Sequence, residues 1–354
     1  MSGRAAMAKG EQKYMWYENK GKENDVVLST RVRLARNITG YPFPGKMTDE
    51  QKKEVIEKVK GAFGDEWDKI EFDKIGEDER AEMLDRHLVS REFLHANGEK
   101  LLVKNDEKSV YIMTPEEDHL RIQSVVAGYD IDAAMAAAFE AEEQADRSLG
   151  FAYNEQYGYI THCPTNVGTG MRISVMVHLP AYTARRGMRD LALQLARIGM
   201  TVRGMGGEGS GSEAGLYQIS NQTTLGISEE DTAKKIREVV DQIIKNEREM
   251  RAKMSEDGRE DLAENARRTY GILMYTQCIG AHEVLSMYSD LRYASELGLT
   301  DIPTEKIDEI FVRCMPKMHR GGFGHGHGEH AHDGSERRER GKKRAEMIRE
   351  ILAK

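Results

Sequence analysis

Four separated segments of the chain carry arginines, carboxylates and a cysteine in short, turn-rich frames, at 29–33, 116–121, 163–172 and 203–209. They supply five arginines: Arg31, Arg33, Arg121, Arg172 and Arg203. Arginine presents a planar fork of donors that fits phosphate oxygens, so arginines that converge from different parts of a fold would bind a polyphosphate. A carboxylate pair beside such a clamp would bind and orient a cationic acceptor. These residue types therefore indicate phosphoryl transfer from ATP to a guanidinium.

The acceptor sets the demands on the carboxylates. A guanidinium has a pKa of about 12.5 to 13.8, so producing a neutral nucleophilic nitrogen at neutral pH costs on the order of 8 kcal/mol. Two carboxylates can orient that nitrogen and accept its proton, while arginines and Mg²⁺ neutralise the γ-phosphoryl charge. We expect Glu117 and Glu208 to be this pair.

Three blocks carry a family resemblance: Ser-Thr-Arg-Val-Arg at 29–33, Glu-Glu-Asp-His-Leu-Arg at 116–121 and Cys-Pro-Thr-Asn-Val-Gly-Thr at 163–169. In this order, with Arg-Gly-x-x-Gly-Glu at 203–208, they resemble the ATP:guanidino phosphotransferase family over about residues 25 to 230. The resemblance implies that Glu117 and Glu208 grip the acceptor and that the Cys163 thiolate lies beside it. Glu116 and Asp118 are then supports or solvated charges.

The resemblance also implies a nucleotide site and its cofactor, with His87 on the adenine side. The residues expected to bind ATP are Ser29, Thr30, Arg31, Val32, Arg33, His87, Arg121, Arg172, Ile173, Ser174, Val175, Met176, Arg203, Gly204 and Gly207. Mg²⁺ is expected to be held mainly by ATP phosphates and water, without a metal site made by the protein.

Simpler interpretations apply to each residue taken alone. A single arginine is usually a surface charge, a cysteine before proline is usually a small buried hydrophobe, and His87 alone would more often be a packing histidine. The glycines of 204–215 fit either a floppy loop or a loop that closes over substrate. The motif context favours the functional interpretation.

The identity of the acceptor is a separate prediction. Kinases of small guanidino metabolites carry a helical domain before the first block, whereas 28 residues precede Ser29 here. An open acceptor side would admit an arginine on a protein surface, and the architecture resembles the bacterial protein arginine kinases. We expect protein arginine phosphorylation that marks substrates for Clp-type proteolysis. The alternatives are a kinase of free arginine or another small guanidino compound, and a phosphoarginine-binding adaptor without catalysis.

The C-terminal region carries a weaker motif. Protein arginine kinases have an Arg-Asp-x-x-Arg-Ala motif that forms an allosteric phosphoarginine pocket, and this chain keeps Arg340, Arg344 and Ala345 but has Gly341 at the aspartate position. A solvated basic helix is the alternative. A histidine tract precedes it, for which we expect a flexible linker with adventitious metal affinity: His319, His325, His327, His330 and His332.

Composition bounds the class of protein. The net charge of −8 argues against a nucleic-acid binder. No long apolar run and no secretory segment follow Met1, so we expect a cytoplasmic protein without membrane contact. Cys163, Cys278 and Cys314 show no paired spacing, which predicts reduced thiols. The resemblance implies protein substrates with exposed arginines, among them a heat-shock repressor, and two further partners: a zinc-binding activator protein and a Clp unfoldase.

The elements that position these residues follow from periodicity. Residues 48–63 predict a helix with Thr48 as N-cap and Gln51 completing a capping box. Apolar or alternating runs predict strands at 101–104, 110–113, 120–126, 159–163, 173–179, 201–203 and 216–219. Helices are predicted at 130–147 and 183–198. The pattern predicts an α+β domain with an antiparallel sheet flanked by helices, which the family resemblance also implies.

After Ser228 the pattern is helical, with further helices at 259–297 and 304–314 and a basic terminal helix. We therefore expect two domains: a catalytic domain over 25–245 and a smaller all-helical regulatory and dimerisation domain over 255–354. A flexible Gly- and His-rich stretch is expected at 320–334. The apolar faces of the helical domain would support a homodimer.

Overall fold

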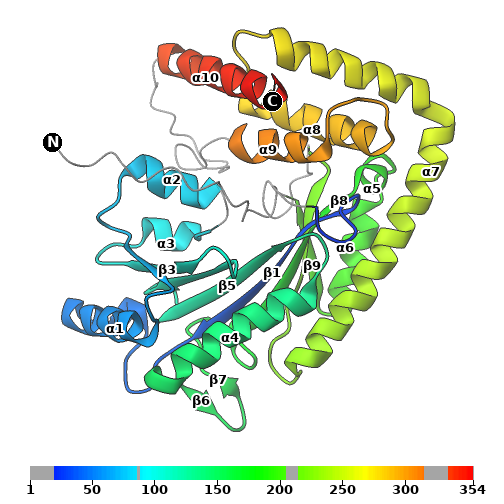
Figure 1. Ribbon diagram of the computed structural model, residues 1–354. Coiled ribbons are helices and arrows are strands. Elements are labelled where there is room, and N and C mark those ends of the chain that lie inside the picture. The colour runs from blue at the N-terminus through cyan, green and yellow to red at the C-terminus, as the bar shows by residue number, and fades with distance from the viewer. Residues whose placement is uncertain (1–19, 86–87, 205–213, 315–333, 354) are drawn as a thin grey trace.

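The computed structural model describes residues 20–85, 88–204, 214–314 and 334–353. Eight strands form one antiparallel sheet in the order β2-β3-β4-β5-β1-β8-β10-β9 (Figure 1). The strands are β1 Val27–Arg36, β2 Asp68–Glu71, β3 Leu101–Asn105, β4 Val110–Thr114, β5 Leu120–Ala127, β8 Met171–His178, β9 Met200–Gly204 and β10 Leu216–Asn221. A separate ribbon pairs β6 Tyr153–Asn154 with β7 Gly158–Tyr159.

One face of the sheet is covered by α4 Ile131–Leu149 and by the first part of α7 Glu229–Tyr275. Alternate residues of β1, including Val32 and Leu34, are fully buried in this core. The facing stripe of α4 is made of small side chains, Ala134, Ala138, Ala141 and Ala145. Their spacing of three and four residues places them on one helix face, so α4 packs closely against the strands.

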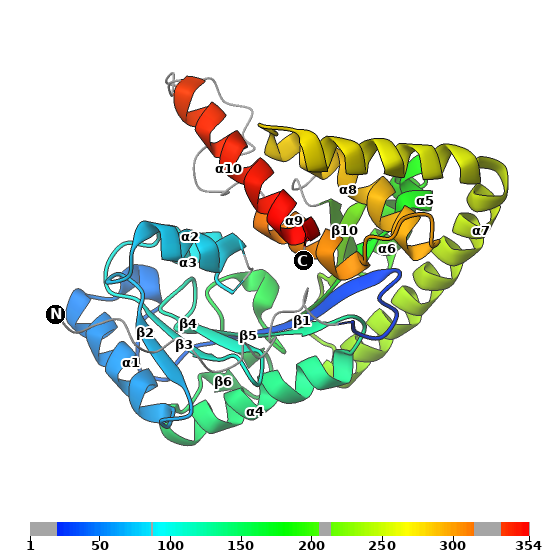
Figure 2. The same ribbon diagram turned by 45° about the horizontal axis from the view of Figure 1, so that its top comes forward.

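The opposite face carries two separate helical groups (Figure 2). At one end, α2 Glu77–Asp85 and α3 Arg91–His95 share a core with Leu102, Tyr111 and Met113 of β3 and β4. At the other end, α8 Ala281–Glu296, α9 Thr304–Cys314 and α10 Gly334–Ala353 share a core with the last part of α7. Sheet residues Val125 and Leu216 enter this second core. The middle of the face lies between the two groups.

The helical part is connected to the sheet by α7 and by a buried ion network. Helix α7 departs from helical geometry at Gly258 (φ −131°, ψ 20°), where it bends toward α8. Arg292 is fully buried and donates to Asp308 (Nε–Oδ1 3.0 Å) and to the carbonyl of Asp25 (3.2 Å). Arg251 donates to the same carbonyl at 2.9 Å. The segment that leads into β1 is thus held by two buried arginines of the helical part.

The α+β prediction is confirmed, and so is the helix at 48–63: α1 Asp49–Ala62 begins with the expected capping box between Thr48 and Gln51. Three expectations are wrong. The block at 29–33 is part of the central strand β1 and not a turn; residues 160–163 form a loop and not a strand; and the helix at 183–198 is divided into α5 Pro180–Ala184 and α6 Met188–Arg197. A further break at 276–280 divides the helix expected at 259–297.

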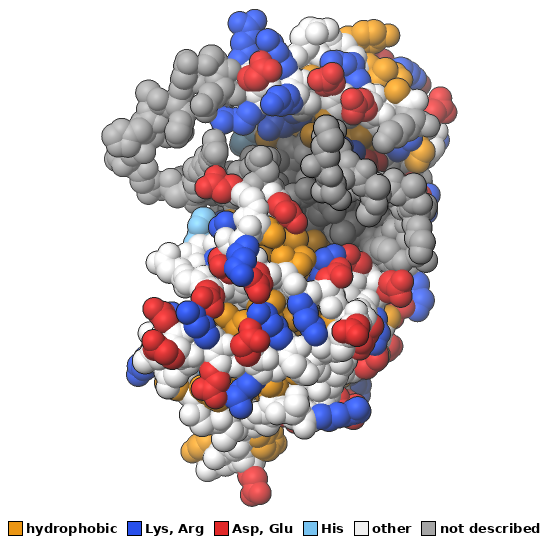
Figure 3. Space-filling view, turned by 60° about the vertical axis from the view of Figure 1, so that its left-hand side comes forward, with side chains coloured by type: hydrophobic (Ala, Val, Ile, Leu, Met, Phe, Trp, Pro, Cys, Tyr) orange, Lys and Arg blue, Asp and Glu red, His pale blue; other side chains and the backbone are white. Residues whose placement is uncertain are grey.

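The surface carries charges of both signs. On the face shown in Figure 3, acidic and basic side chains are interspersed over much of the surface. No helix in the described residues is long and apolar enough to cross a membrane.

Candidate active site

The strand register places the predicted clamp arginines on one face of the sheet. Arg33 lies directly opposite Arg172 on β8, and Arg31 lies opposite Ser174. Arg121 lies opposite Ala35, two residues beyond Arg33 on β1. Directly paired residues of neighbouring strands point to the same face, and residues two apart on one strand do so as well. These four arginines therefore share the face that carries the two helical groups.

Arg203 joins them through β10. Arg203 lies opposite Gln218 on β10, and Gln218 lies opposite Met176 on β8. Met176 is four residues from Arg172 on the same strand, an even separation, so both point to the same face. We call the set of Arg31, Arg33, Arg121, Arg172 and Arg203 the arginine face. The even spacing along β1 and β8 indicates alternation, but only the strand register shows that the five side chains, from four strands, share one face.

The same register corrects part of the predicted nucleotide site. Val32, Ile173 and Val175 are fully buried on the opposite face, so their side chains pack the core and do not line the arginine face. Thr30 is also buried, and its hydroxyl donates to the carbonyl of Gly128 (2.7 Å). These residues serve the site by fixing the strands.

The remaining strand residues of that prediction lie on the arginine face or at its end. Ser174 accepts a hydrogen bond from Nε of Arg31 (3.3 Å). Ser29 and Met176 are paired with each other toward the helical part, and Met176 packs against its core. Gly204 ends β9. His87, Gly207 and Glu208 lie outside the described residues.

The arginine face is poorly compensated in electrostatic terms. Burial, together with the charges of Arg121 and Arg172, lowers the pKa of Arg31 to about 10. Burial and the neighbouring arginines also lower the pKa of Arg33. Nε of Arg33 is buried and has no hydrogen-bond partner among the described residues. A buried donor without an acceptor costs about 1–3 kcal/mol, so this face favours an anion with several oxygen acceptors.

Glu116 is the acidic group that holds the edge of this face. It is buried and accepts hydrogen bonds from Arg121, from the hydroxyl of Ser90 (2.6 Å) and from the backbone N–H of Glu117 (2.7 Å). Burial alone would raise the pKa of Glu116, but the charge of Arg121 and these hydrogen bonds outweigh it and lower the pKa. Glu116 is thus the support that the sequence predicts, and it orients Arg121.

The predicted acceptor residues meet beside Glu116. The side chain of Glu117 is 39% exposed, and its Oε1 lies 3.5 Å from Nδ1 of His162. Cys163 follows His162 in the chain and is partly exposed, with its Sγ 3.0 Å from Oγ1 of Thr165. Two predicted catalytic groups, Glu117 and Cys163, therefore lie at the same corner of the sheet.

A buried carboxylate holds this corner together. Oδ1 of Asp118 accepts from Nδ2 of Asn37 (2.6 Å) and from the backbone N–H of His162 (2.6 Å). Burial raises the pKa of Asp118, and the two hydrogen bonds oppose that shift. Sequence reasoning missed Asn37, His162 and Ser90, because their partners are 26 to 82 residues away in the chain. The only local signal in the sequence is that Asn37 directly follows the first block's strand and His162 directly precedes Cys163.

Two of the C-terminal motif residues, Arg344 and Ala345, contact neighbouring parts of the helical region. Ala345 is fully buried, and Nη1 of Arg344 donates to the carbonyl of Ile279 (2.8 Å). A Cβ atom on Gly341 would lie 2.4 Å from Sγ of Cys278. Cys278 thus occupies the space that a side chain at position 341 would need.

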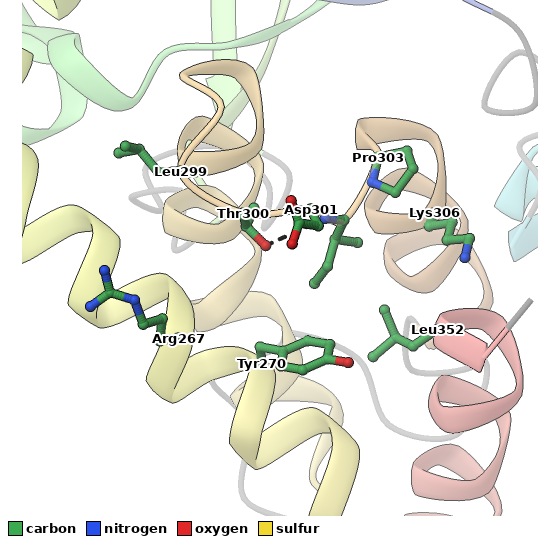
Figure 4. Close-up of a pocket in the computed structure, with 9 residues that line it drawn as sticks. Arg267, Tyr270, Leu299, Thr300, Asp301, Pro303, Lys306 and Leu352 are labelled. Carbon is green, nitrogen blue, oxygen red and sulfur yellow. Dashed lines mark hydrogen bonds between the residues drawn. The ribbon is translucent and has the colours of Figure 1, made fainter.

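A separate cavity of about 390 Å³ lies in the helical part, between α7, the loop before α9 and the end of α10 (Figure 4). None of the motif residues Arg340, Arg344 and Ala345 lines it. Its lining residues are Arg267, Tyr270, Leu299, Thr300, Asp301, Ile302, Pro303, Lys306 and Leu352.

The described residues contain no group of three or more histidine, cysteine or acidic side chains that could hold a metal ion by itself. Glu116 is engaged by Arg121. This donor set fits Mg²⁺ that is coordinated mainly by nucleotide phosphates and water. When bound, Mg²⁺ would add positive charge at the β- and γ-phosphates.

An antiparallel sheet with an arginine-lined face, bordered by a half-exposed glutamate and a cysteine, defines a phosphotransferase with a cationic acceptor. A family model described as "ATP:guanido phosphotransferase, C-terminal catalytic domain" matches residues 47–250. One described as "Protein-arginine kinase McsB C-terminal domain" matches residues 259–354. The chain belongs to the ATP:guanido phosphotransferase family and is an ATP-dependent protein-arginine kinase.

Individual relatives agree with this assignment. The protein-arginine kinase of Clostridium acetobutylicum is 36% identical over 85% of this chain and 90% of its own length. That of Brevibacillus brevis is 35% identical over 95% of this chain and 94% of its own length. Among solved structures, the duplicated taurocyamine kinase of Schistosoma mansoni is similar, with a TM-score of 0.58 and 28% identity over 63% of this chain. This chain spans about a third of that structure, 33%.

Proposed function

We propose that the enzyme transfers the γ-phosphoryl group of Mg-ATP to arginine side chains of protein substrates. The observation that carries the proposal is the arginine face, where Arg31, Arg33, Arg121 and Arg172 gather on one side of the sheet. It is a site for a polyanion. ATP on this face would satisfy Nε of Arg33 and relieve the repulsion among the arginines.

Glu117 provides the acceptor side of the reaction. Its carboxylate would bind the incoming guanidinium, orient one nitrogen toward the γ-phosphorus and accept the proton that this nitrogen loses. The new N–P bond forms as the bond between the γ-phosphorus and the bridging oxygen breaks, and ADP leaves. We infer the same gripping role for Glu208, and for Cys163 a thiolate beside the guanidinium.

Exposure favours a protein acceptor over a small one. Glu117 is 39% exposed and the neighbouring His162 is 53% exposed. A guanidinium carried on a polypeptide needs such an open approach, because its main chain must remain outside the site. We also propose the finer roles that the family resemblance implies: a cytoplasmic enzyme, marking for Clp-type proteolysis, homodimerisation, regulation by a zinc-binding activator protein, and a heat-shock repressor as a substrate.

The test is transfer of labelled γ-phosphate from Mg-ATP to an arginine-rich unfolded protein and, separately, to free arginine. Glu117→Gln and Glu208→Ala serve as inactive controls, and binding of ATP to each variant shows that the nucleotide site is intact. We expect acid-labile label on the protein with wild-type enzyme and none with the variants. Label on free arginine alone would replace the proposal with a small-guanidino kinase, and no transfer to either would favour a phosphoarginine-binding adaptor.

A further inference from the structure

We propose that His162 is the proton outlet of the acceptor site, taking the proton that Glu117 removes from the guanidinium and passing it to solvent. The inference rests on the proposed function, because it names the next carrier of the proton released there. His162 acts through Glu117 and is therefore a positioning and relay residue and not a catalytic one.

The backbone fixes where His162 sits. Its N–H donates to Oδ1 of Asp118 at 2.6 Å, and Asp118 directly follows Glu117 in the chain. Asp118 is 2% exposed and is itself held by Asn37. The ring of His162 also packs edge-on against Phe43, with 5.5 Å between ring centroids. Two separate segments are thus joined so that the imidazole and the Glu117 carboxylate face each other.

The two groups lie within reach of each other. Nδ1 of His162 lies 3.5 Å from Oε1 of Glu117, at the outer limit of a hydrogen bond. Catalytic hydrogen bonds tighten in the Michaelis complex. Nε2 has no hydrogen-bond partner in the described residues, and the side chain is 53% exposed. One ring nitrogen therefore faces the base and the other is open to water.

The reaction releases a proton that has to leave the acceptor site. Each turnover forms one N–P bond, breaks one bond between the γ-phosphorus and the bridging oxygen, and releases one proton from the guanidinium nitrogen. Glu117 accepts that proton and must lose it before the next turnover. A neutral imidazole takes it at Nδ1 and releases the other proton from Nε2 to water, so the ring returns to its first protonation state after a tautomer change.

The test compares His162→Ala and His162→Asn with wild type and with His282→Ala, an exposed histidine in α8 that serves as the matched control. Asparagine keeps a polar group near the position of Nδ1 but cannot carry a proton. ADP formation is followed at saturating Mg-ATP and acceptor, in dilute buffer, with and without added imidazole. ATP affinity and thermal unfolding are measured on every variant.

We expect kcat to fall by about tenfold in both His162 variants, less than the roughly hundredfold or greater loss expected for a direct general base. Added imidazole should restore kcat in His162→Ala, and it should leave wild type and His282→Ala unchanged. Full activity in His162→Asn, or a loss in His162→Ala that imidazole does not restore, would overturn the relay. The assay is run with protein arginine and with free arginine; which acceptor wild type uses tests the proposed function, and the relay is judged on either.

Discussion

Arg33 and Arg36 lie on the same strand, three residues apart, and point to opposite faces. Replacing them should therefore change the free energy of unfolding in opposite directions. Arg33 lies among like charges with an unsatisfied Nε. Arg36 is fully buried, donates to Glu142 (2.5 Å) and to the carbonyl of Thr169 (3.0 Å), and stacks 3.5 Å over the ring of Tyr159. Replacement of each by methionine preserves most of the aliphatic volume and removes the charge.

The magnitudes follow from these surroundings. Arg33→Met removes a buried donor without an acceptor and should raise the free energy of unfolding of the ATP-free enzyme by about 1–3 kcal/mol. The same variant loses a hydrogen bond to an anionic ligand, worth about 1.5–3 kcal/mol, so ATP affinity should fall roughly 10- to 150-fold. Arg36→Met leaves the Glu142 carboxylate buried and unpaired, which should destabilise the fold by about 3–5 kcal/mol.

Urea unfolding followed by the fluorescence of buried Trp67, together with calorimetric titration of ATP, measures both effects. Equal urea dependence across the variants is needed before their midpoints are compared. If Arg33→Met destabilises the enzyme as much as Arg36→Met does, and ATP affinity is unchanged, then the arginine face is an internally satisfied ion cluster. The assignment of a polyphosphate site would then be refuted.

Three further predictions concern stability. Glu116→Gln should destabilise the enzyme most at neutral pH. The pKa of Glu116 in the folded enzyme is below 4.5, so the stability that its charge contributes is present above pH 4.5 and is lost as the pH falls through the folded pKa. A difference in unfolding free energy from wild type that stays constant in a pH series of urea unfolding would contradict this. Gly341→Ala should cost about 1–3 kcal/mol by overpacking against Cys278. Cys278→Ala in the same chain should recover that loss in thermal unfolding, and failure to recover would exclude the contact as the cause. Asp308→Asn should cost about 1.5–3 kcal/mol because Arg292 loses one of its two buried carboxylate partners and keeps Glu296; a loss below about 0.5 kcal/mol in chemical denaturation would contradict it.

The sequence predicts the elements well where the signal is local. The capping box of Thr48 and Gln51, and the alanine stripe of α4, involve neighbours within a few residues, and both are found in the structure. The block at 29–33 was wrongly expected to form a turn, because a strand with arginines on one face and apolar residues on the other resembles a charged loop when its partners are unknown.

The site is predicted only in part for the same reason. Motif resemblance selects Arg31, Arg33, Glu117 and Cys163, but it does not separate side chains that face the ligand from those that face the core. Val32, adjacent to two of these residues, is in the core. That distinction comes from strand register, which depends on residues about 90 to 140 positions away along the chain.

Two buried contacts join residues on either side of the Gly258 bend: Arg292 donates to the carbonyl of Asp25, and Arg251 pairs with Glu296. A protease that cuts α7 at the Gly258 bend would sever the chain between the two family-model regions. The pieces would nevertheless remain together, because buried charges and the shared apolar residues Val125 and Leu216 still cross the cut. We therefore expect the sheet and the helical part to unfold together.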